Sequence, residues 1–230
     1  DTIFNYESLN YVNLYKKSRL KAVDIGTTDI VERVKGHIAH LLPDISEQML
    51  VINYLAHNVQ YPGKKIQWGI VLQGVEGDGK SFISEMMQAI MGLDNVRIMN
   101  SKTLNSDFTG WVSGQCMTFI EELKLDGNRK YEVLNNLKPY ISNSVVESEK
   151  KGHDPQVVMN TTNYFAFTNF KDSLPLTDKD RRYLVLFSQW QTARNIEKFI
   201  TDNPNYYSSL YTDMQNNAGE ILSWLTDHVI

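Results

Sequence analysis

The amino-acid sequence predicts an α/β domain with a mostly parallel central sheet, flanked by helical segments at both ends. Short apolar runs that fit buried strands alternate with stretches that carry apolar residues at helical spacing. A glycine-rich turn follows the first of these runs and leads directly into a helical stretch. The 230 residues suffice for one such domain with a small helical appendage.

Composition is that of an ordinary globular protein, with 42% hydrophobic and 22% charged residues. The net charge of −4 provides no global basic field, so any contact with nucleic acid must be local. No apolar run approaches the roughly 20 residues that span a bilayer, so no membrane partner is expected. The single cysteine, Cys116, lies in an apolar stretch and is expected in the core, which suits a reducing, cytoplasmic compartment.

Two helical stretches begin the regular pattern. Apolar residues recur at helical spacing from about Thr28 to Leu42 and from Ser46 to His57. Pro43 and Asp44 mark the break between them. The pattern therefore predicts two packed helices before the sheet.

Four apolar runs predict the strands. The first, Ile66–Leu72, is compact and suits a buried parallel strand. Helical spacing then continues from Phe82 until Gly92 ends it. The other runs are Met117–Ile120, Tyr164–Thr168 and Tyr183–Phe187.

These patterns divide the chain into three parts. Residues 1–60 form an N-terminal helical segment, residues 61–190 a core, and residues 191–230 a C-terminal helical subdomain. Turn chemistry at residues 61–65 marks the first boundary. The chain begins with Asp1 rather than methionine, which indicates a fragment of a longer polypeptide.

The turn "GVEGDGKS", from Gly74 to Ser81, matches the phosphate-binding pattern G-x-x-x-x-G-K-[ST]. Glycines allow positive φ and bring backbone N–H groups against phosphate oxygens, and the following helix points its positive end at the same anion. Lys80 is expected to bridge the β- and γ-phosphates, while the Ser81 hydroxyl ligates Mg²⁺. A glycine-rich surface turn is the alternative. The residues expected to bind nucleotide are Gly74, Gly77, Asp78, Gly79, Lys80, Ser81 and Phe82.

Two carboxylates, Glu121 and Glu122, end the second apolar run. At the end of a buried strand, such acids can hold Mg²⁺ through water and polarise an attacking water molecule. We expect Glu121 on the metal side and Glu122 as the catalytic group that positions and activates the attacking water. A solvent-facing pair at a strand end is the alternative.

The order of these motifs resembles that of the superfamily 3 helicases of DNA viruses and phages. Within them it is most similar to the C-terminal helicase domains of phage and poxvirus-type primase-helicases or primase-polymerases. The resemblance covers about Gln60 to Phe187 and implies a P-loop NTPase of the AAA+ type. The motifs that carry it are the phosphate loop, "FIEEL" at 119–123, "SVVESEKKGHDPQVV" at 144–158, "YFAFTN" at 164–169 and "DKDRRYLVLF" at 178–187. Thr168 departs from the serine that this family often has before its sensor asparagine.

The resemblance implies catalytic roles for two further positions. Asn169 would be the polar sensor that orients the attacking water. Arg182 would be the arginine finger that reaches the nucleotide of a neighbouring subunit, with Arg181 as the other candidate, because a guanidinium supplies fixed positive charge to the transition state. The alternative for both arginines is a surface salt bridge with Asp178 or Asp180.

The third motif reads as a β-hairpin with a glycine turn at Gly152, between valine pairs at 145–146 and 157–158. In the resembling helicases such a hairpin projects into the channel of a ring, which implies DNA contacts from its tip. Lysine meets phosphate as a mobile point charge and grips it without sequence preference. The residues expected to contact DNA are Lys150, Lys151 and His153. Glu149 and Asp154 flank them, so a solvated hairpin tip is the alternative.

The resemblance implies an ATP-dependent DNA helicase or translocase domain of a viral or phage replication protein, with ATP and Mg²⁺ as its cofactors. The implied partners are single-stranded or forked DNA, further copies of the chain in a homo-oligomeric ring, expected as a hexamer, and a primase or primase-polymerase domain linked upstream. The N-terminal helices would form the collar of the ring. The implied location is the bacterial host cytoplasm.

Two other functions share the phosphate loop. A small-molecule kinase would act as a monomer and close its arginines over the nucleotide in cis. A non-catalytic module would bind nucleotide only to assemble a complex, although the two strand-end acids and Asn169 argue against it.

Two other groups of residues suggest sites but favour a structural role. His37 and His40 lie three apart on a predicted helix, yet no carboxylate or cysteine cluster accompanies them, which favours surface or core histidines over a metal site. Tyrosines at 206, 207 and 211 could stack on bases, but their helical spacing favours packing. The segment 122–130 has a basic end that could contact DNA or a neighbouring subunit, but a solvated loop is favoured.

Overall fold

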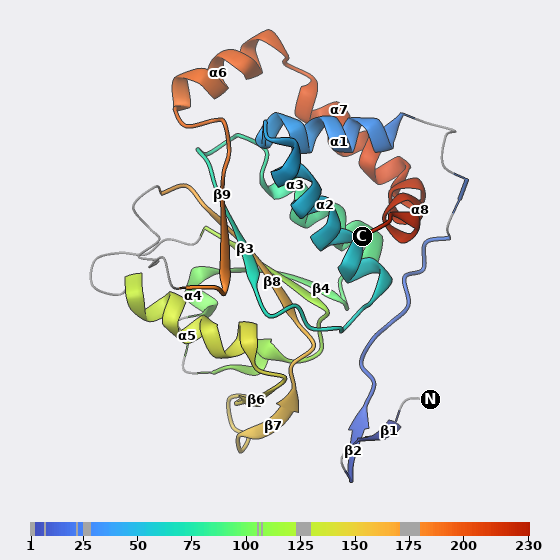
Figure 1. Cartoon of the computed structure of the whole chain (residues 1–230), viewed down its shortest axis with the longest axis vertical. Coiled ribbons are helices and arrows are strands. Elements are labelled where there is room, and N and C mark those ends of the chain that lie inside the picture. The colour runs from blue at the N-terminus through green and yellow to red at the C-terminus, as the bar shows by residue number, and fades with distance from the viewer. Residues whose placement is uncertain are drawn as a thin grey trace.

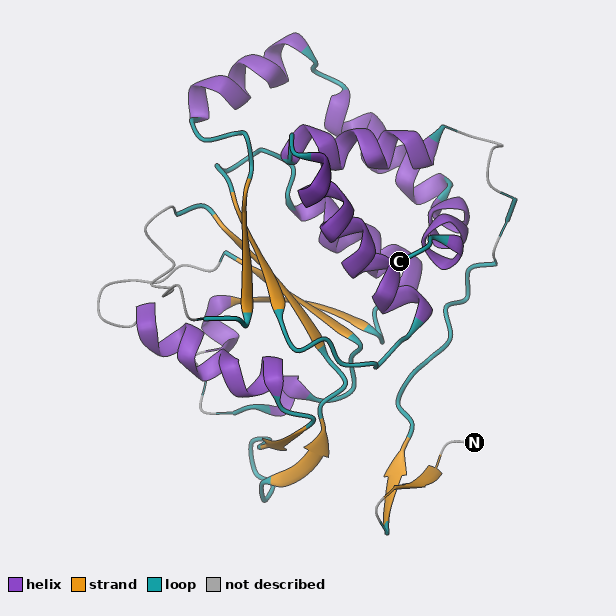
Figure 2. Cartoon of the chain, viewed as in Figure 1, coloured by secondary structure: helices purple, strands orange, loops and turns teal. Residues whose placement is uncertain are grey.

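The computed structural model describes residues 3–6, 8–21, 23–24, 29–104, 106, 108–122, 130–170 and 180–230. At its centre lies a five-stranded sheet in which every neighbouring pair of strands runs parallel (Figures 1 and 2). The strands, in spatial order, are β4 (Val96–Asn100), β5 (Met117–Glu121), β8 (Asn163–Thr168), β3 (Gly69–Gln73) and β9 (Tyr183–Phe187). The predicted α/β class with a mostly parallel sheet is confirmed.

Both faces of the sheet are covered, because successive side chains of each strand enter opposite cores. In β3, Ile70 and Leu72 belong to one hydrophobic cluster and Val71 to the other. In β8, Phe165 lies in the first cluster and Ala166 in the second. This burial on two sides explains why the central strands read as continuous apolar runs in the sequence.

Helices from both ends of the chain cover the first face together (Figure 1). α8 contacts α1, α2 and α3, so the N- and C-terminal helices share one core. Asp44 caps α2 by accepting hydrogen bonds from Ser46 N at 2.7 Å and Glu47 N at 3.3 Å, which explains the break seen in the sequence. These helices are α1 (Ile30–Leu41), α2 (Ile45–Gln60), α3 (Ser81–Met91), α7 (Tyr206–Asn216) and α8 (Ala218–Asp227).

The opposite face is covered by shorter elements. They are α4 (Ser101–Leu104), a 3₁₀ turn (Gly110–Val112) and α5 (Lys130–Ser142). Trp111, Leu137 and Ile141 from these elements enter the second cluster. α6 (Ala193–Asp202) follows β9 and lies above the carboxyl ends of the strands in Figure 1.

The first residues of the chain differ from the helical segment expected over 1–60. β1 (Ile3–Tyr6) and β2 (Leu9–Val12) pair antiparallel as a small separate hairpin. The helices of this segment begin only at Ile30, and the first predicted strand begins at Gly69 instead of Ile66. Within the ranges given above, no helix is long and apolar enough to cross a membrane.

A second hairpin, β6 (Val145–Ser148) and β7 (Gln156–Met159), lies at the amino ends of the sheet strands (Figure 1). Val146 pairs with Val158, and Gly152 in the turn has φ +78°. This conformation favours glycine because it has no Cβ. The hairpin predicted over 144–158, with its glycine turn, is therefore confirmed.

Lys65 ties the base of this hairpin to the domain. Its Nζ donates to Tyr140 O of α5 at 2.6 Å, to Thr162 O before β8, and to Asn160 Oδ1 at 3.4 Å. Asn160 Nδ2 in turn donates to Tyr140 O at 2.5 Å and to Asn143 O at 2.7 Å. Burial lowers the pKa of Lys65 to about 7. The hairpin base, α5 and the start of β8 therefore form one hydrogen-bonded unit.

Cys116 precedes β5 and is buried, with 4% of its surface exposed. Burial raises the pKa of its thiol to about 11. The thiol is therefore protonated at neutral pH, which agrees with the expected role in the core.

Candidate nucleotide-binding site

The loop Gly74–Lys80 connects the carboxyl end of β3 to the first residue of α3. Gly77 and Gly79 have φ +83° and +92°, values at which a side chain would be strained. A Cβ on Gly79 would lie 2.6 Å from both His37 Cε1 and Tyr207 Cε1. The loop therefore packs closely against α1 and α7, and the strand–loop–helix context expected of a phosphate cradle is present.

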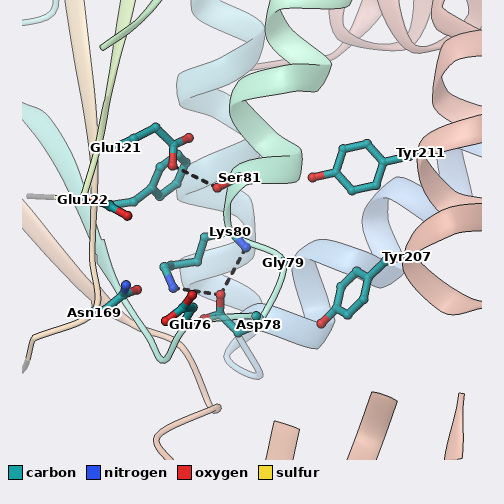
Figure 3. Close-up of a pocket in the computed structure, with 12 residues that line it drawn as sticks. Glu76, Asp78, Gly79, Lys80, Ser81, Glu121, Glu122, Asn169, Tyr207 and Tyr211 are labelled. Carbon is teal, nitrogen blue, oxygen red and sulfur yellow. Dashed lines mark hydrogen bonds and ion pairs between the residues drawn. The ribbon is translucent and has the colours of Figure 1, made fainter. Parts of the chain in front are cut away.

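Lys80 is 6% exposed, and its Nζ is held by its own loop. It donates to Asp78 Oδ1 at 2.8 Å, to Val75 O at 2.8 Å and to Gly74 O at 3.0 Å. The ammonium group thus lies inside the loop with three oxygen acceptors of the loop itself. Figure 3 shows its contact with Asp78.

Asp78 is the most deeply buried carboxylate of the loop, with 1% exposure. Its Oδ1 also accepts from Lys80 N at 3.2 Å. Burial raises the pKa of this carboxyl, while the charge and hydrogen bonds of Lys80 oppose the rise. A Cβ on Gly74 would lie 2.0 Å from Asp78 Oδ2, so glycine at 74 is required for this side chain to fit.

Glu121, at the end of β5, faces the first turn of α3. Its Oε2 accepts from Ser81 Oγ at 2.9 Å and its Oε1 from Ser84 Oγ at 2.9 Å. A hydroxyl and a carboxylate are oxygen ligands of the kind that Mg²⁺ prefers, usually together with substrate phosphates. Among the residues that the structure describes, no three His, Cys, Asp or Glu side chains gather into a complete metal site. The pair therefore fits a metal ion that arrives with a phosphate ligand.

A cavity of about 330 Å³ joins the loop to the carboxyl ends of β5 and β8 and to α7. Figure 3 shows its lining, with Glu121 and Glu122 on one side of Lys80 and the α7 tyrosines on the other. The expected site residues that line it are Gly77, Asp78, Gly79, Lys80, Ser81, Glu121, Glu122 and Asn169. Residues far apart in sequence are thus brought to one edge of the sheet.

Two residues expected to bind nucleotide do not line this cavity. Gly74, the first residue of the loop, is buried against Asp78 and Ser188 and does not reach the cavity. Phe82 is fully buried and meets His37 and Tyr211 edge-on, with ring centroids 4.9 and 5.3 Å apart. The Phe82 side chain therefore belongs to the core, and only its backbone is available to a ligand.

Sequence reasoning missed four residues that line the cavity, which are Glu76, Phe167, Tyr207 and Tyr211. The two tyrosines were expected as packing residues, and burial raises the pKa of both phenols. Their spacing of four residues places them on one face of α7, which is the signal that was available. The sequence alone could not tell which partner that face meets.

His37 and His40 take the structural role favoured by the sequence. His37 is fully buried, and its Nε2 donates to Gly79 O at 3.0 Å while its Nδ1 accepts from Tyr206 Oη at 3.2 Å. Burial lowers the pKa of each imidazole to about 4. Both rings are therefore neutral at physiological pH and support the loop from α1.

The cavity lies at the carboxyl ends of the strands, whereas Arg182 lies at their amino ends, immediately before β9. Its backbone N–H donates to Asp180 Oδ1 at 3.1 Å and its Nε to Ser142 Oγ at 2.7 Å. Asp180 Oδ2 pairs with Lys138 at 2.6 Å, and Asp178 lies outside the described residues. A strand of five residues, or roughly 16 Å, separates Arg182 from the loop edge. Arg182 therefore does not reach the cavity of its own chain, and Arg181 beside it is exposed.

The tip of the β6–β7 hairpin is exposed, including Lys150, Lys151 and His153. Thr109 Oγ1 accepts from Glu149 N at 2.9 Å and thereby joins the tip to the 3₁₀ turn. Lys150 lies against Gly110, where an added Cβ would come 2.8 Å from Lys150 Cγ. Segment 123–129, part of the expected loop, lies outside the described residues.

Comparisons with known proteins show which sequences this chain is similar to. Residues 72–182 match a family described as a family of unknown function (DUF5906). The chain is similar to the DNA primase-polymerase of Nitratiruptor phage NrS-1, with 24% identity over 207 residues. That match covers 85% of this chain and 28% of the relative, so the chain spans less than a third of the relative's length.

Solved structures share the fold. The C-terminal region of NrS-1 matches with a TM-score of 0.81 and 20% identity, over 99% of this chain and 53% of that one. JCV helicase matches with a TM-score of 0.52 and 14% identity, over 89% and 56% of the two chains. The expected likeness to phage primase-polymerases is thus confirmed, and the fold is helicase-like.

Proposed function

We propose that this chain is the ATP-dependent motor domain of a viral or phage replication protein, a DNA helicase or translocase that hydrolyses Mg-ATP between the subunits of a ring. The observation that carries the proposal is the meeting of Lys80, Ser81, Glu121, Glu122 and Asn169 around one cavity. These residue types correspond to the parts that phosphoryl-transfer sites need for phosphate, metal and attacking water.

In this proposal the backbone N–H groups of Gly77–Ser81 hold the phosphates and Lys80 bridges the β- and γ-phosphates. Ser81 and Glu121 would hold Mg²⁺, and the ion would supply positive charge to the phosphate oxygens. Glu122 accepts a proton from the attacking water, and Asn169 orients that water from the end of β8. Each of these side chains already lines the cavity, and Lys80 would exchange oxygens of its own loop for phosphate oxygens on binding.

The positive charge that completes the site is proposed to come from a second copy of the chain. Arg182 lies roughly 16 Å from the loop edge of its own sheet, the length of one five-residue strand. A neighbouring copy that presents its amino-end edge to this cavity would supply the guanidinium in trans. Ring assembly, with six subunits as the expected number, is therefore part of the proposed mechanism.

The exposed tip of the β6–β7 hairpin is the proposed DNA contact, through Lys150, Lys151 and His153. All three side chains are exposed, so they are free to meet a phosphate backbone. Single-stranded or forked DNA is the proposed substrate. The similarity to a phage DNA primase-polymerase supports a primase or primase-polymerase domain on the same polypeptide, and the host cytoplasm as its location.

A small-molecule kinase is the second candidate, since it shares the loop and the metal pair. A kinase closes its arginines over the nucleotide of the same chain, whereas Arg182 lies at the far edge of the sheet and donates its Nε to Ser142. That position disfavours the kinase, because Arg182 would have to cross the sheet to reach the phosphates.

Steady-state Mg-ATP hydrolysis tests the proposal, measured with and without single-stranded DNA over protein concentrations that span assembly. We expect turnover per chain to rise with protein concentration and with DNA, and Lys80→Ala to abolish it. Turnover that ignores both protein concentration and DNA would instead support a kinase or an assembly module.

A further inference from the structure

The buried ion pair between Asp78 and Lys80 involves the same lysine that is proposed to bind the triphosphate. Asp78 Oδ1 lies 2.8 Å from Lys80 Nζ, and the exposures of the two residues are 1% and 6%. The phosphate loop therefore contains a carboxylate that neutralises its own cation, although its proposed ligand is strongly anionic. A neutral residue at position 78 would leave the lysine charge wholly available to the ligand.

A bound triphosphate favours the protonated form of the Asp78 carboxyl. Phosphate oxygens that accept from Lys80 take over part of the attraction that now stabilises the Asp78 carboxylate, and they add negative charge near it. Because Asp78 is almost fully buried, water cannot replace what the lysine provided. An ionised Asp78 is therefore penalised in the complex, and the penalty disappears when the carboxyl binds a proton.

We propose that Asp78 positions Lys80 when no nucleotide is bound. When the phosphates of a nucleoside triphosphate replace Asp78 as the partner of Lys80, the Asp78 carboxyl takes up a proton. The inference depends on the proposed function only in requiring that the loop binds such a ligand. By linkage, protonation of Asp78 must strengthen nucleotide binding to the same extent that nucleotide favours the proton. Asp78 is thus a positioning residue that makes nucleotide affinity depend on pH.

The groups that face Asp78 from other elements do not offer a competing source of protons near neutral pH. Burial lowers the pKa of His37 and His40 on α1 to about 4, so both stay neutral above pH 6. Burial raises the pKa of Tyr207 on α7 above its usual range, and Asp78 adds to that rise. Ser188, after β9, lies against Gly74 and does not titrate.

Calorimetric titration with the Mg²⁺ complex of a non-hydrolysable ATP analogue tests the inference. Titrations at pH 7 and pH 8, each in two buffers with different ionisation enthalpies, give the number of protons bound per nucleotide. The variants are Asp78→Asn, which keeps the shape and an acceptor for Lys80, and Glu76→Gln. Glu76 is the matched control because it lines the same cavity from the same loop and Lys80 does not contact it in the described hydrogen bonds.

We expect the wild type and Glu76→Gln to take up more protons than Asp78→Asn, by up to one proton per nucleotide. The ligand's own ionisation cancels in this difference. The ratio of wild-type to Asp78→Asn dissociation constants should rise with pH, by at most about tenfold per pH unit for one coupled proton. Equal proton uptake and parallel pH profiles in wild type and Asp78→Asn would overturn the inference while leaving the proposed function intact.

Absence of nucleotide binding in every variant, the wild type included, would overturn the proposed function itself. If Asp78→Asn does not fold, the wild type and Glu76→Gln still decide the matter. Both must then bind more tightly as pH falls from 8 to 7, after correction for the measured ionisation of the free analogue, and a flat profile in both contradicts the inference.

Discussion

The carboxyl ends and the amino ends of the sheet strands, called below the carboxyl edge and the amino edge, are built in opposite ways. At the carboxyl ends of the strands, the phosphate loop packs against α1, α7 and Ser188 after β9, its Asp78 and Lys80 are buried, and the lysine already has three oxygen partners within the loop. At the amino edge, the hairpin tip carries lysines that are exposed to solvent. The difference shows that Lys80 is held by contacts within its own loop, whereas the lysines of the hairpin tip are exposed to solvent.

The largest expected effect tests whether Arg182, at the amino ends of the strands in one copy, reaches the cavity of a neighbouring copy. Arg182→Ala should reduce ATP turnover by about 10³-fold, the scale for losing an arginine finger, with an unchanged nucleotide dissociation constant. Arg181→Ala is the matched control and should keep most turnover. Mixing Arg182→Ala with Lys80→Ala chains should restore part of the rate, because one supplies the intact loop and the other the intact arginine. A rate that stays near wild type in Arg182→Ala would remove the finger assignment.

The next prediction tests whether His37, beneath the phosphate loop, is shielded from water. The pKa of His37 is lowered to about 4 in the folded chain from an unfolded value near 6.5. Between these values the unfolded chain binds the proton and the folded chain does not, so stability falls as pH decreases from 6.5 towards 4. The shift corresponds to about 3 kcal/mol.

Thermal melting of the wild type and of His37→Gln between pH 7 and 4 measures this effect. We expect His37→Gln to reduce the pH dependence but not abolish it, because the half-buried His40 retains a lowered pKa of about 4. The glutamine amide can still donate to Gly79 O, so the variant is expected to fold. His153→Gln, at the exposed hairpin tip, is the control and should retain the wild-type slope. The same slope in all three chains would show that the histidine under the loop is hydrated after all.

A smaller effect tests the fit of the loop around Asp78. Gly74→Ala places a Cβ 2.0 Å from Asp78 Oδ2 and 2.7 Å from Ser188 Cβ, and should destabilise the fold by about 1–3 kcal/mol. Gly36→Ala in α1 meets nothing within 4 Å and should stabilise it by about 0.5–1 kcal/mol. Chemical denaturation gives both values, and equal stability of the two variants would refute the close approach at Gly74.

The smallest effect concerns the amino edge. Lys151→Ala should lose stimulation of ATP turnover by DNA while basal turnover remains. Loss of one phosphate contact should also reduce the salt slope of single-strand binding by about 0.7. Lys198→Ala, an exposed lysine on α6, is the matched control. If both variants respond to DNA like the wild type, the hairpin tip is only solvated.

Local sequence predicted much of the carboxyl edge. The glycines, Lys80 and Ser81 are contiguous, and Glu121 and Asn169 directly follow or end apolar strands, so their arrival at one edge follows from parallel strand order. Tyr207 could not be predicted in the same way, because its contact with Gly79 spans more than half the chain. The surroundings of Asp78 could not be predicted either, because Ser188, which lies beside it around Gly74, is distant in the sequence.

Other elements carry a weak local signal. β4 is an edge strand with Arg97 and a polar end, so it lacks the continuous apolar run of the central strands. α5 contains Pro139, and its mean hydropathy is close to neutral, which hides its helical period. The β1–β2 hairpin forms a separate two-stranded sheet outside the central one, so the rules that identify buried strands do not apply to it.

β8 has a mechanical consequence for the molecule. The strand begins beside the Lys65 and Asn160 hydrogen bonds at the hairpin base and ends next to Asn169 in the cavity, roughly 20 Å away. It is hydrogen-bonded to β5 on one side and β3 on the other, so it cannot stretch or slide without breaking two ladders. β8 therefore connects the hairpin base to Asn169 through one strand that is paired on both sides.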